Sequence, residues 1–344
     1  MDLTTGDRRP ATGDRLFDVY LAVDWSARSL PSPARPTADA LWVGEALAAA
    51  PHDSQESYWR TRAACVAYVR ARLVAHVRAG RRVLIGCDFP YGYPVGTAAA
   101  LSGGTALAGD AAPSYAAAAL SGDAAPSYDT GDAAWRWMWD WLVARIADDA
   151  ANGNNRFAVA AAANACAGGS PPGPFWGCPP AQAGPHLTPT SPPYPYATAA
   201  GPVLARLRAV ERRLRGTQPC WKLLGTGSVG GQALVGIPRV AAWRADPALA
   251  AVSRVWPFET GFTALPTIGR GPAIIHAEIW PGVVPDPLDP RVPIRDQAQV
   301  RAVARWLAAH DAVGTLGRLF DLPPDLTPAA TAACLAEEGW LLGA

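Results

Sequence analysis

Four carboxylates of the chain share one sequence context. Each ends or interrupts an apolar run typical of a buried strand, or opens a helix that follows such a run. Carboxylates that converge at strand ends cannot all stay ionised without a cation, and oxygen ligands favour a hard divalent ion. Two Mg²⁺ or Mn²⁺ ions held by acids are a common apparatus for in-line displacement at phosphorus. The expected metal ligands and catalytic residues are Asp24, Asp88, Glu278 and Asp296.

Structural explanations compete with this interpretation for some of the acids. Asp296 also suits the N-terminal dipole of its own helix, and Glu278 also fits the solvent face of a pleated strand. Glu259, in the sequence VWPFET, has a similar context to Glu278 and is an alternative acid for the same role. Asp24 and Asp88 are harder to explain in this way, because an acid at the end of a buried strand is costly to desolvate.

A glycine-rich loop at 222–232, KLLGTGSVGGQ, is a second candidate for chemistry. It contains a literal G-x-G-x-x-G, but a dinucleotide site requires a strand before the loop and an uninterrupted helix after it. The preceding segment is a poor strand, and Pro238 is expected to cut the following helix short. A backbone nest for a phosphate fits better, and a solvated basic helix beside a flexible loop is the alternative. The expected phosphate-binding residues are Lys222, Gly225, Gly227, Ser228, Arg212 and Arg215.

Three further residues are candidates for binding a polar ligand. Ser26 would place a hydroxyl near Asp24, and Asn155 with Arg156 lies in a segment that contains all four asparagines of the chain. An Asn-Gly turn followed by an asparagine N-cap explains that segment equally well. The tryptophans at 135–141 could stack on bases, although a helical core explains them more simply.

Composition limits the class of protein. The 30 basic and 29 acidic residues nearly balance, so there is no global basic surface for long nucleic acid, although a local basic groove is compatible with this. The six cysteines form no C-x-x-C pair, which suits free thiols in a reducing compartment. The first 15 residues lack an apolar signal core, and no apolar run approaches the ~20 residues that span a bilayer. We expect a cytoplasmic protein with no membrane segment, and nothing indicates its oligomeric state.

Hydrophobic patterns predict two α/β portions around an insertion. The expected elements are strands at 16–27, 37–47, 83–87, 253–258 and 273–280, and helices at 54–79, 132–149, 157–167, 203–215 and 294–309. The helix at 54–79 is long enough for a crossover between parallel strands. Residues 168–202 are dense in proline and glycine and are expected to be irregular. The heptapeptide GDAAPSY occurs at 109–115 and again at 122–128, and this local duplication predicts a surface loop.

Several motifs resemble those of predicted nucleases of ribonuclease-H fold that carry a domain-of-unknown-function label. The resemblance rests on the early strand end VDWS at 23–26 and on the D-x-P-x-G-x-P turn DFPYGYP at 88–94. It continues at AEIWP (277–281), at the helix of Asp296, at the basic stretch 211–215 and at EEGW (337–340). Residues 95–200 have little counterpart. The resemblance implies a ribonuclease-H-like sheet and a metal-dependent acid cluster.

The sequence as a whole predicts an α/β protein with a ribonuclease-H-like mixed sheet flanked by helices. The expected parts are a first half of the core at 14–94, a helical and Pro/Gly-rich insertion at 95–235, and a second half with C-terminal helices at 236–344. The expected activity is metal-dependent hydrolysis of a phosphodiester in nucleic acid or a nucleotide. Transfer of a phosphoryl or nucleotidyl group on the same fold and a non-catalytic binding protein are the alternatives.

Overall fold

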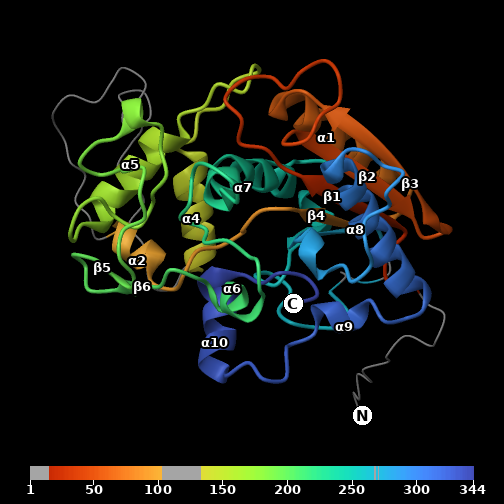
Figure 1. The fold of residues 1–344 in the computed structure, drawn as a ribbon. Helices are drawn as coiled ribbons and strands as arrows, with labels where there is room; N and C mark the ends of the chain where they lie inside the picture. Colours follow the sequence, from red (N-terminus) through yellow and green to blue (C-terminus); the bar gives the residue numbers. More distant parts are fainter. Residues whose placement is uncertain (1–14, 103–132, 267–268, 270) are drawn as a thin grey trace, which may run out of the picture.

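The computed structural model of the chain describes residues 15–102, 133–266, 269 and 271–344 (Figure 1). Both GDAAPSY repeats lie outside these residues. The centre is a six-stranded mixed sheet with the order β3-β2-β1-β4-β8-β7. Its strands are β1 (Val19–Asp24), β2 (Leu41–Leu47), β3 (Ala50–Trp59), β4 (Arg82–Cys87), β7 (Ser253–Val255) and β8 (Ala273–Glu278). The first three are antiparallel neighbours, and β1, β4, β8 and β7 are parallel. The prediction of an α/β protein with a mixed sheet is confirmed.

One of the expected helices begins with a strand instead. Residues 54–59 belong to β3, which is antiparallel to β2 and places Trp59 opposite Leu41. The helix α1 (Arg62–Arg78) follows β3. The side chain of Thr61 caps this helix by accepting from the amide of Ala64. Tyr58 packs against Trp42 across the hairpin at 5.2 Å, and cross-strand aromatic pairs of this kind stabilise a sheet.

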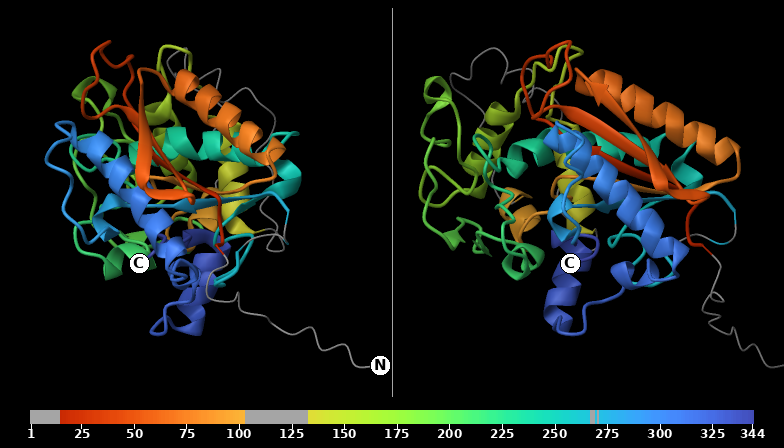
Figure 2. Two further views of the ribbon diagram at one scale, coloured as in Figure 1. Left: turned by 90° about the vertical axis from the view of Figure 1, so that its right-hand side faces the viewer. Right: turned by 45° about the vertical axis from the view of Figure 1, so that its right-hand side comes forward.

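The sheet is buried on both faces because side chains alternate along each strand. Val19, Leu21 and Val23 of β1 pack in one core together with α1. Tyr20 and Ala22 point the other way, into a second core with α8 (Arg295–Ala312). Figure 2 shows α1 and α8 on opposite sides of the strands.

Most of the insertion between β4 and β7 packs into the first of these cores, and Val210 packs into the second. Its described elements are α2 (Thr97–Ser102), α4 (Ala134–Val143), α5 (Arg156–Ala167), η1 (Pro180–Gln182), β5 (Tyr196–Ala197), β6 (Val203–Leu204) and α6 (Ala209–Arg213). The helix expected at 203–215 is therefore reduced to α6, since its first residues pair with β5. The four tryptophans of α4 are buried, so they form core and not a stacking surface.

The helix α7 (Val229–Ala245) continues through Pro238, which was expected to end it. A proline inside a helix costs about 3 kcal/mol. Extensive burial of α7, including Ile237, Val240 and Trp243, offsets this cost. Because α7 runs across position 235, the boundary expected there falls within a helix. Gly236 lets Phe89 pack directly on α7, since an added Cβ would lie 2.4 Å from the phenyl ring.

The chain ends beside the sheet. The remaining elements are η2 (Ala250–Val252), η3 (Pro281–Val283), α9 (Gly317–Phe320), α10 (Pro328–Ala333) and the π-helical turn η4 (Cys334–Glu338). The amide of Leu342 donates to the carbonyl of Glu278 at 2.9 Å, so the C-terminal residues form a parallel bridge with the end of β8. All six cysteines are free. Among the described residues, no helix is both long and apolar enough to cross a membrane.

Candidate active site at the ends of β1 and β4

Asp24 and Asp88 lie side by side at the carboxyl ends of two neighbouring parallel strands. Asp24 is the last residue of β1, and Asp88 directly follows β4. Val23 is the register partner of Cys87, and the amide of Asp88 donates to the carbonyl of Val23 at 3.0 Å. This edge of a parallel sheet is where α/β proteins generally bind ligands. We call Asp24 and Asp88 the acid pair.

The electrostatics of the acid pair favour a bound cation. Burial raises the pKa of Asp24 well above its usual range, and the carboxylates of Asp88 and Asp296 raise it further. Burial likewise raises the pKa of Asp88, and the negative charges of Asp296 and Glu278 raise it further. Neither carboxylate of the pair accepts a hydrogen bond from a described residue. A positive ion would relieve this repulsion and replace the lost hydration.

Asp296 reaches the acid pair from the first turn of α8. The helix approaches the sheet closely at Gly44 of β2, where an added Cβ would lie 2.6 Å from the carbonyl oxygen of Val300. The carboxylate of Asp296 accepts from the amide of Asp39 at 2.6 Å, in the loop between β1 and β2. Burial raises its pKa, and the bonds to the amides of Asp39 and Ala40 partly oppose that effect. Asp296 therefore anchors this loop and also adds negative charge to the site.

Glu278 is held by a buried arginine. It lies on β8 opposite Cys87, and both its carboxylate oxygens accept from Arg208, at 2.6 and 2.8 Å. The amide of Tyr91 donates to the same carboxylate at 3.0 Å, which fixes the turn after Asp88. Both side chains of this ion pair are at most 4% exposed. These bonds engage both carboxylate oxygens of Glu278 and tie it to Arg208 and to the turn after Asp88.

Glu259, the alternative acid, belongs to another ion-pair network. Arg244 donates to both its oxygens at 2.8 and 2.9 Å, and Arg136 approaches one of them at 3.1 Å. Burial opposes ionisation of Glu259, but the bonds from Arg244 and from the amide of Val255 outweigh it and lower the pKa. Glu259 is therefore a structural acid at the end of β7.

The glycine loop precedes α7 but lacks the strand of a dinucleotide site. Among the described residues, the chain before the loop forms only an isolated bridge between Trp176 and Lys222. The ammonium of Lys222 donates to the carbonyl of Thr226 at 2.5 Å, so it closes the loop. Gly225 and Gly227 adopt the positive φ angles of 87° and 72° that the loop requires. Ser228 is the N-cap residue of α7 by position but makes no side-chain capping bond.

The two arginines expected to bind phosphate are exposed. Arg212 lies on α6 and Arg215 just after it, and Arg212 donates to the carbonyl of Leu207 within its own segment.

The polar candidates near Asp24 have different roles. The hydroxyl of Ser26 donates to the carbonyl of Asp39 at 3.2 Å. Asn155 occupies the N-cap position of α5, but its side chain bridges the amide of Ala147 and the carbonyl of Arg145 instead of capping. Arg156, in contrast, carries a buried guanidinium that bonds to the side chain of Ser29 at 2.9 Å.

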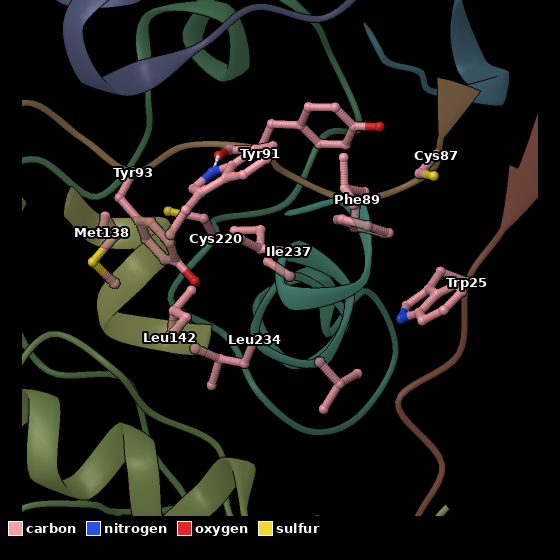
Figure 3. Packing of buried hydrophobic residues seen from close by; sticks show 14 of the residues in the cluster. Trp25, Cys87, Phe89, Tyr91, Tyr93, Met138, Leu142, Cys220, Leu234 and Ile237 are labelled. Carbon is pink, nitrogen blue, oxygen red and sulfur yellow. Dashed lines mark hydrogen bonds between the residues drawn. The ribbon is translucent and has the colours of Figure 1, made fainter. Parts of the chain in front are cut away.

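The aromatic residues around Asp88 form core. Phe89 packs against Trp25 at 5.8 Å and against Tyr91 at 5.6 Å, and all three rings are at most 2% exposed (Figure 3). The aromatic rings of the turn at 88–94 point into the core. Gly92 lies so close to the backbone of Glu337 that a Cβ would sit 2.2 Å from the carbonyl oxygen. The packing holds the backbone of Asp88 rigidly.

Within the part of the chain that the structure describes, no group of three or more His, Cys, Asp or Glu side chains is placed to hold a metal ion. Three residues with buried, ion-paired side chains were not among those predicted from the sequence: Arg62, Asp148 and Arg208. Comparisons of the chain with protein-family models, with curated proteins and with solved structures gave no match.

Proposed function

We propose that the protein is a metal-dependent phosphodiester hydrolase whose reaction centre is the acid pair. The observation that carries this proposal is the approach of two carboxylates, the buried Asp24 and the half-buried Asp88, without a hydrogen-bond donor for either among the described residues. Buried charges of one sign are normally paired or bind a metal. A site that keeps such repulsion has a function that benefits from it.

Mg²⁺ or Mn²⁺ fits the residues present better than an ion that needs a complete protein cage. Mg²⁺ is usually bound by one or two carboxylates, with water and substrate phosphates as the other ligands. Asp24 and Asp88 would hold the ion, and Asp296 would add negative charge. The bound ion would polarise the phosphate and lower the pKa of an attacking water. Glu278, tied to Arg208, would keep the turn of Asp88 in place.

The proposal includes a ribonuclease-H-like arrangement of the core. The support for it is the succession of three antiparallel strands, a helix, a parallel strand β4 beside β1, and a further parallel strand β8. The acids of β1, β4 and α8 meet at one edge of this sheet. This topology also agrees with the motifs at 23–26 and 88–94.

The test is cleavage of single-stranded and duplex DNA and RNA with Mg²⁺ or Mn²⁺, compared with EDTA. We expect cleavage that requires the metal and that Asp24→Asn and Asp88→Asn abolish. Folded variants that cleave as fast as the wild type would contradict the proposal. Asp53, exposed on β3, offers the matched control Asp53→Asn, which should cleave normally.

Phosphoryl or nucleotidyl transfer is the second candidate, because the glycine loop lies close to the acid pair. Gln232, in the first turn of α7, donates its side-chain amide to the carbonyl of Trp25 at 2.5 Å, directly after Asp24. Thermal stabilisation by a nucleotide and not by an oligonucleotide would favour this candidate. A non-catalytic binding protein is favoured if neither Mg²⁺ nor Mn²⁺ binds and Asp88→Asn leaves metal behaviour unchanged.

A further inference from the structure

A cluster of guanidinium groups beside the acid pair holds more positive than negative charge. It consists of Arg62, Arg156 and Arg239 around the single carboxylate of Asp148, and we call it the arginine cluster. Arg62 and Asp148 form a complete, fully buried ion pair with bonds of 2.6 and 2.8 Å. Arg239 shares the same carboxylate at 3.0 Å. One negative charge thus faces three positive charges.

Arg156 is the member of the cluster without a carboxylate of its own. The residue is 5% exposed, and no ion pair joins it to an acid in the described part of the chain. Its Nη1 donates to two neutral oxygens, of Ser29 at 2.9 Å and of Asn154 at 2.8 Å. Its Nε is buried without an acceptor, as is the Nε of Arg239. Burial, with repulsion from Arg62, lowers the pKa of Arg156 to about 10. Buried cations are normally paired, so the cluster lacks an anion.

A helix N-terminus adds positive potential at the same place. Nε of Arg156 lies 3.5 Å from the position that a Cβ on Gly231 would occupy, in the first turn of the 17-residue helix α7. The amides of a first turn point away from the helix and, with the helix dipole, favour phosphate groups. The amide of Gly231 already donates to the carbonyls of Lys222 and Ser228, at 3.3 and 3.0 Å, so the helix contributes its dipole while the guanidinium of Arg156 supplies the donor without an acceptor.

The arginine cluster is attached to the residues that follow Asp24. Nη1 of Arg62 donates to the carbonyls of Ser26 and Arg28, at 2.9 and 2.7 Å. Gln232 of α7 bonds to the carbonyl of Trp25. Ser29 is exposed, so a ligand can approach the partner of Arg156 from solvent.

We propose that Arg156, Ser29 and the first turn of α7 bind a second phosphate group of the substrate, beside the phosphate that reacts at the acid pair. This proposal rests on the proposed function for the identity of the substrate. The binding of phosphate itself requires neither the metal nor the acids. A substrate with at least two phosphate groups, such as an oligonucleotide, would use both sites.

The test is thermal unfolding of metal-free protein in inorganic phosphate, against chloride at the same ionic strength. We expect a saturable rise in Tm for the wild type and at least about tenfold weaker phosphate binding for Arg156→Gln, because a charge-assisted bond is lost. Arg318→Gln removes the same charge from an exposed arginine of α9, away from the arginine cluster, and should respond like the wild type. A folded Arg156→Gln variant with the wild-type phosphate response would overturn the proposal.

A second variant separates the site from general destabilisation. Ser29→Asp would place a carboxylate beside the guanidinium and occupy the anion site from within the chain. We expect it to raise Tm without phosphate and to abolish the response to phosphate. A variant with lowered Tm and an intact response would count against the site. Asp88→Asn should keep the phosphate response even where it abolishes cleavage, so failure here and failure of the proposed hydrolase are distinguishable.

Discussion

The amide of Asp88 donates to the carbonyl of Val23 at 3.0 Å, so the ladder between β1 and β4 continues to the point where both acids leave the sheet. This bond holds the backbones of Asp24 and Asp88 at the same position along the two strands. The packing of Phe89 on Trp25 and Gly236 then prevents the turn from moving away. The fold therefore keeps both carboxylates at the same edge of the sheet, where each raises the electrostatic cost of ionising the site.

Replacement of Asp88 by asparagine should raise the stability of the metal-free protein and lower its cleavage activity. Asp88→Asn removes the charge that burial and its neighbours disfavour, so we expect the metal-free variant to gain about 0.5–2 kcal/mol in the free energy of unfolding. Cleavage should fall by at least about 100-fold, because metal catalysis contributes several kcal/mol. Denaturant unfolding and a cleavage assay measure the two effects. Asp53→Asn, at an exposed position, should change neither, and a loss of stability in Asp88→Asn would contradict the repulsion.

The acid pair should also set the pH dependence of stability. Since the pKa values of Asp24 and Asp88 are raised in the fold, the folded state binds more protons than the unfolded state. Their contribution to stability is therefore largest below the ordinary value of 3.8 and falls as pH rises through the raised values. Burial of Glu337 raises its pKa to about 7 and acts in the same direction. The free energy of unfolding is measured as a function of pH for the wild type and for the double variant Asp24→Asn, Asp88→Asn. The difference between the two slopes is the contribution of the acid pair.

Metal binding should release protons from the same two groups. Carboxylates must be ionised to act as ligands, so the affinity for Mg²⁺ should rise with pH in the range where stability of the metal-free protein falls. Calorimetric titrations in buffers of different ionisation enthalpy count the protons released. Binding with no proton release and no dependence on pH would place the metal elsewhere.

The pairing of Glu278 with Arg208 predicts the opposite response to mutation from that of Asp88. Glu278→Ala takes from the buried guanidinium of Arg208 one of its two carboxylate partners, and only Glu211 remains paired with it. Breaking a buried ion pair costs up to about 3–5 kcal/mol, so we expect a clear loss of stability. Arg208→Ala should destabilise to a similar extent. Denaturant unfolding without metal is the measurement. A Glu278→Ala variant that is more stable than the wild type would restore Glu278 as a repelled metal ligand like Asp88.

The sequence predicted best those elements that a local pattern determines. The apolar runs before Asp24 and Asp88 and around Glu278 are strands, and their parallel pairing follows from the intervening connections. Residues 54–59 were assigned to a helix because their pairing with β2 is not visible locally. Arg208 lies in a charged stretch that indicates an exposed helix, yet its burial depends on a carboxylate 70 residues away. The excess of positive charge around Arg156 could not be predicted from a local pattern either, because its charged residues come from three separate segments of the chain.

The approach of α8 to the sheet at Gly44 should control the position of Asp296. Val300 is one helical turn after Asp296, and its carbonyl oxygen would lie 2.6 Å from a Cβ at position 44. Gly44→Ala therefore forces α8 outward, at a cost of about 1–3 kcal/mol in stability from overpacking. The displaced Asp296 would contribute less charge to the acid pair, so affinity for Mg²⁺ should fall as well. Gly271→Ala is the matched control, because a Cβ there meets no atom within 4 Å and the change should be nearly neutral. If Gly44→Ala lowers stability but leaves Mg²⁺ affinity unchanged, Asp296 serves only to anchor the loop of Asp39.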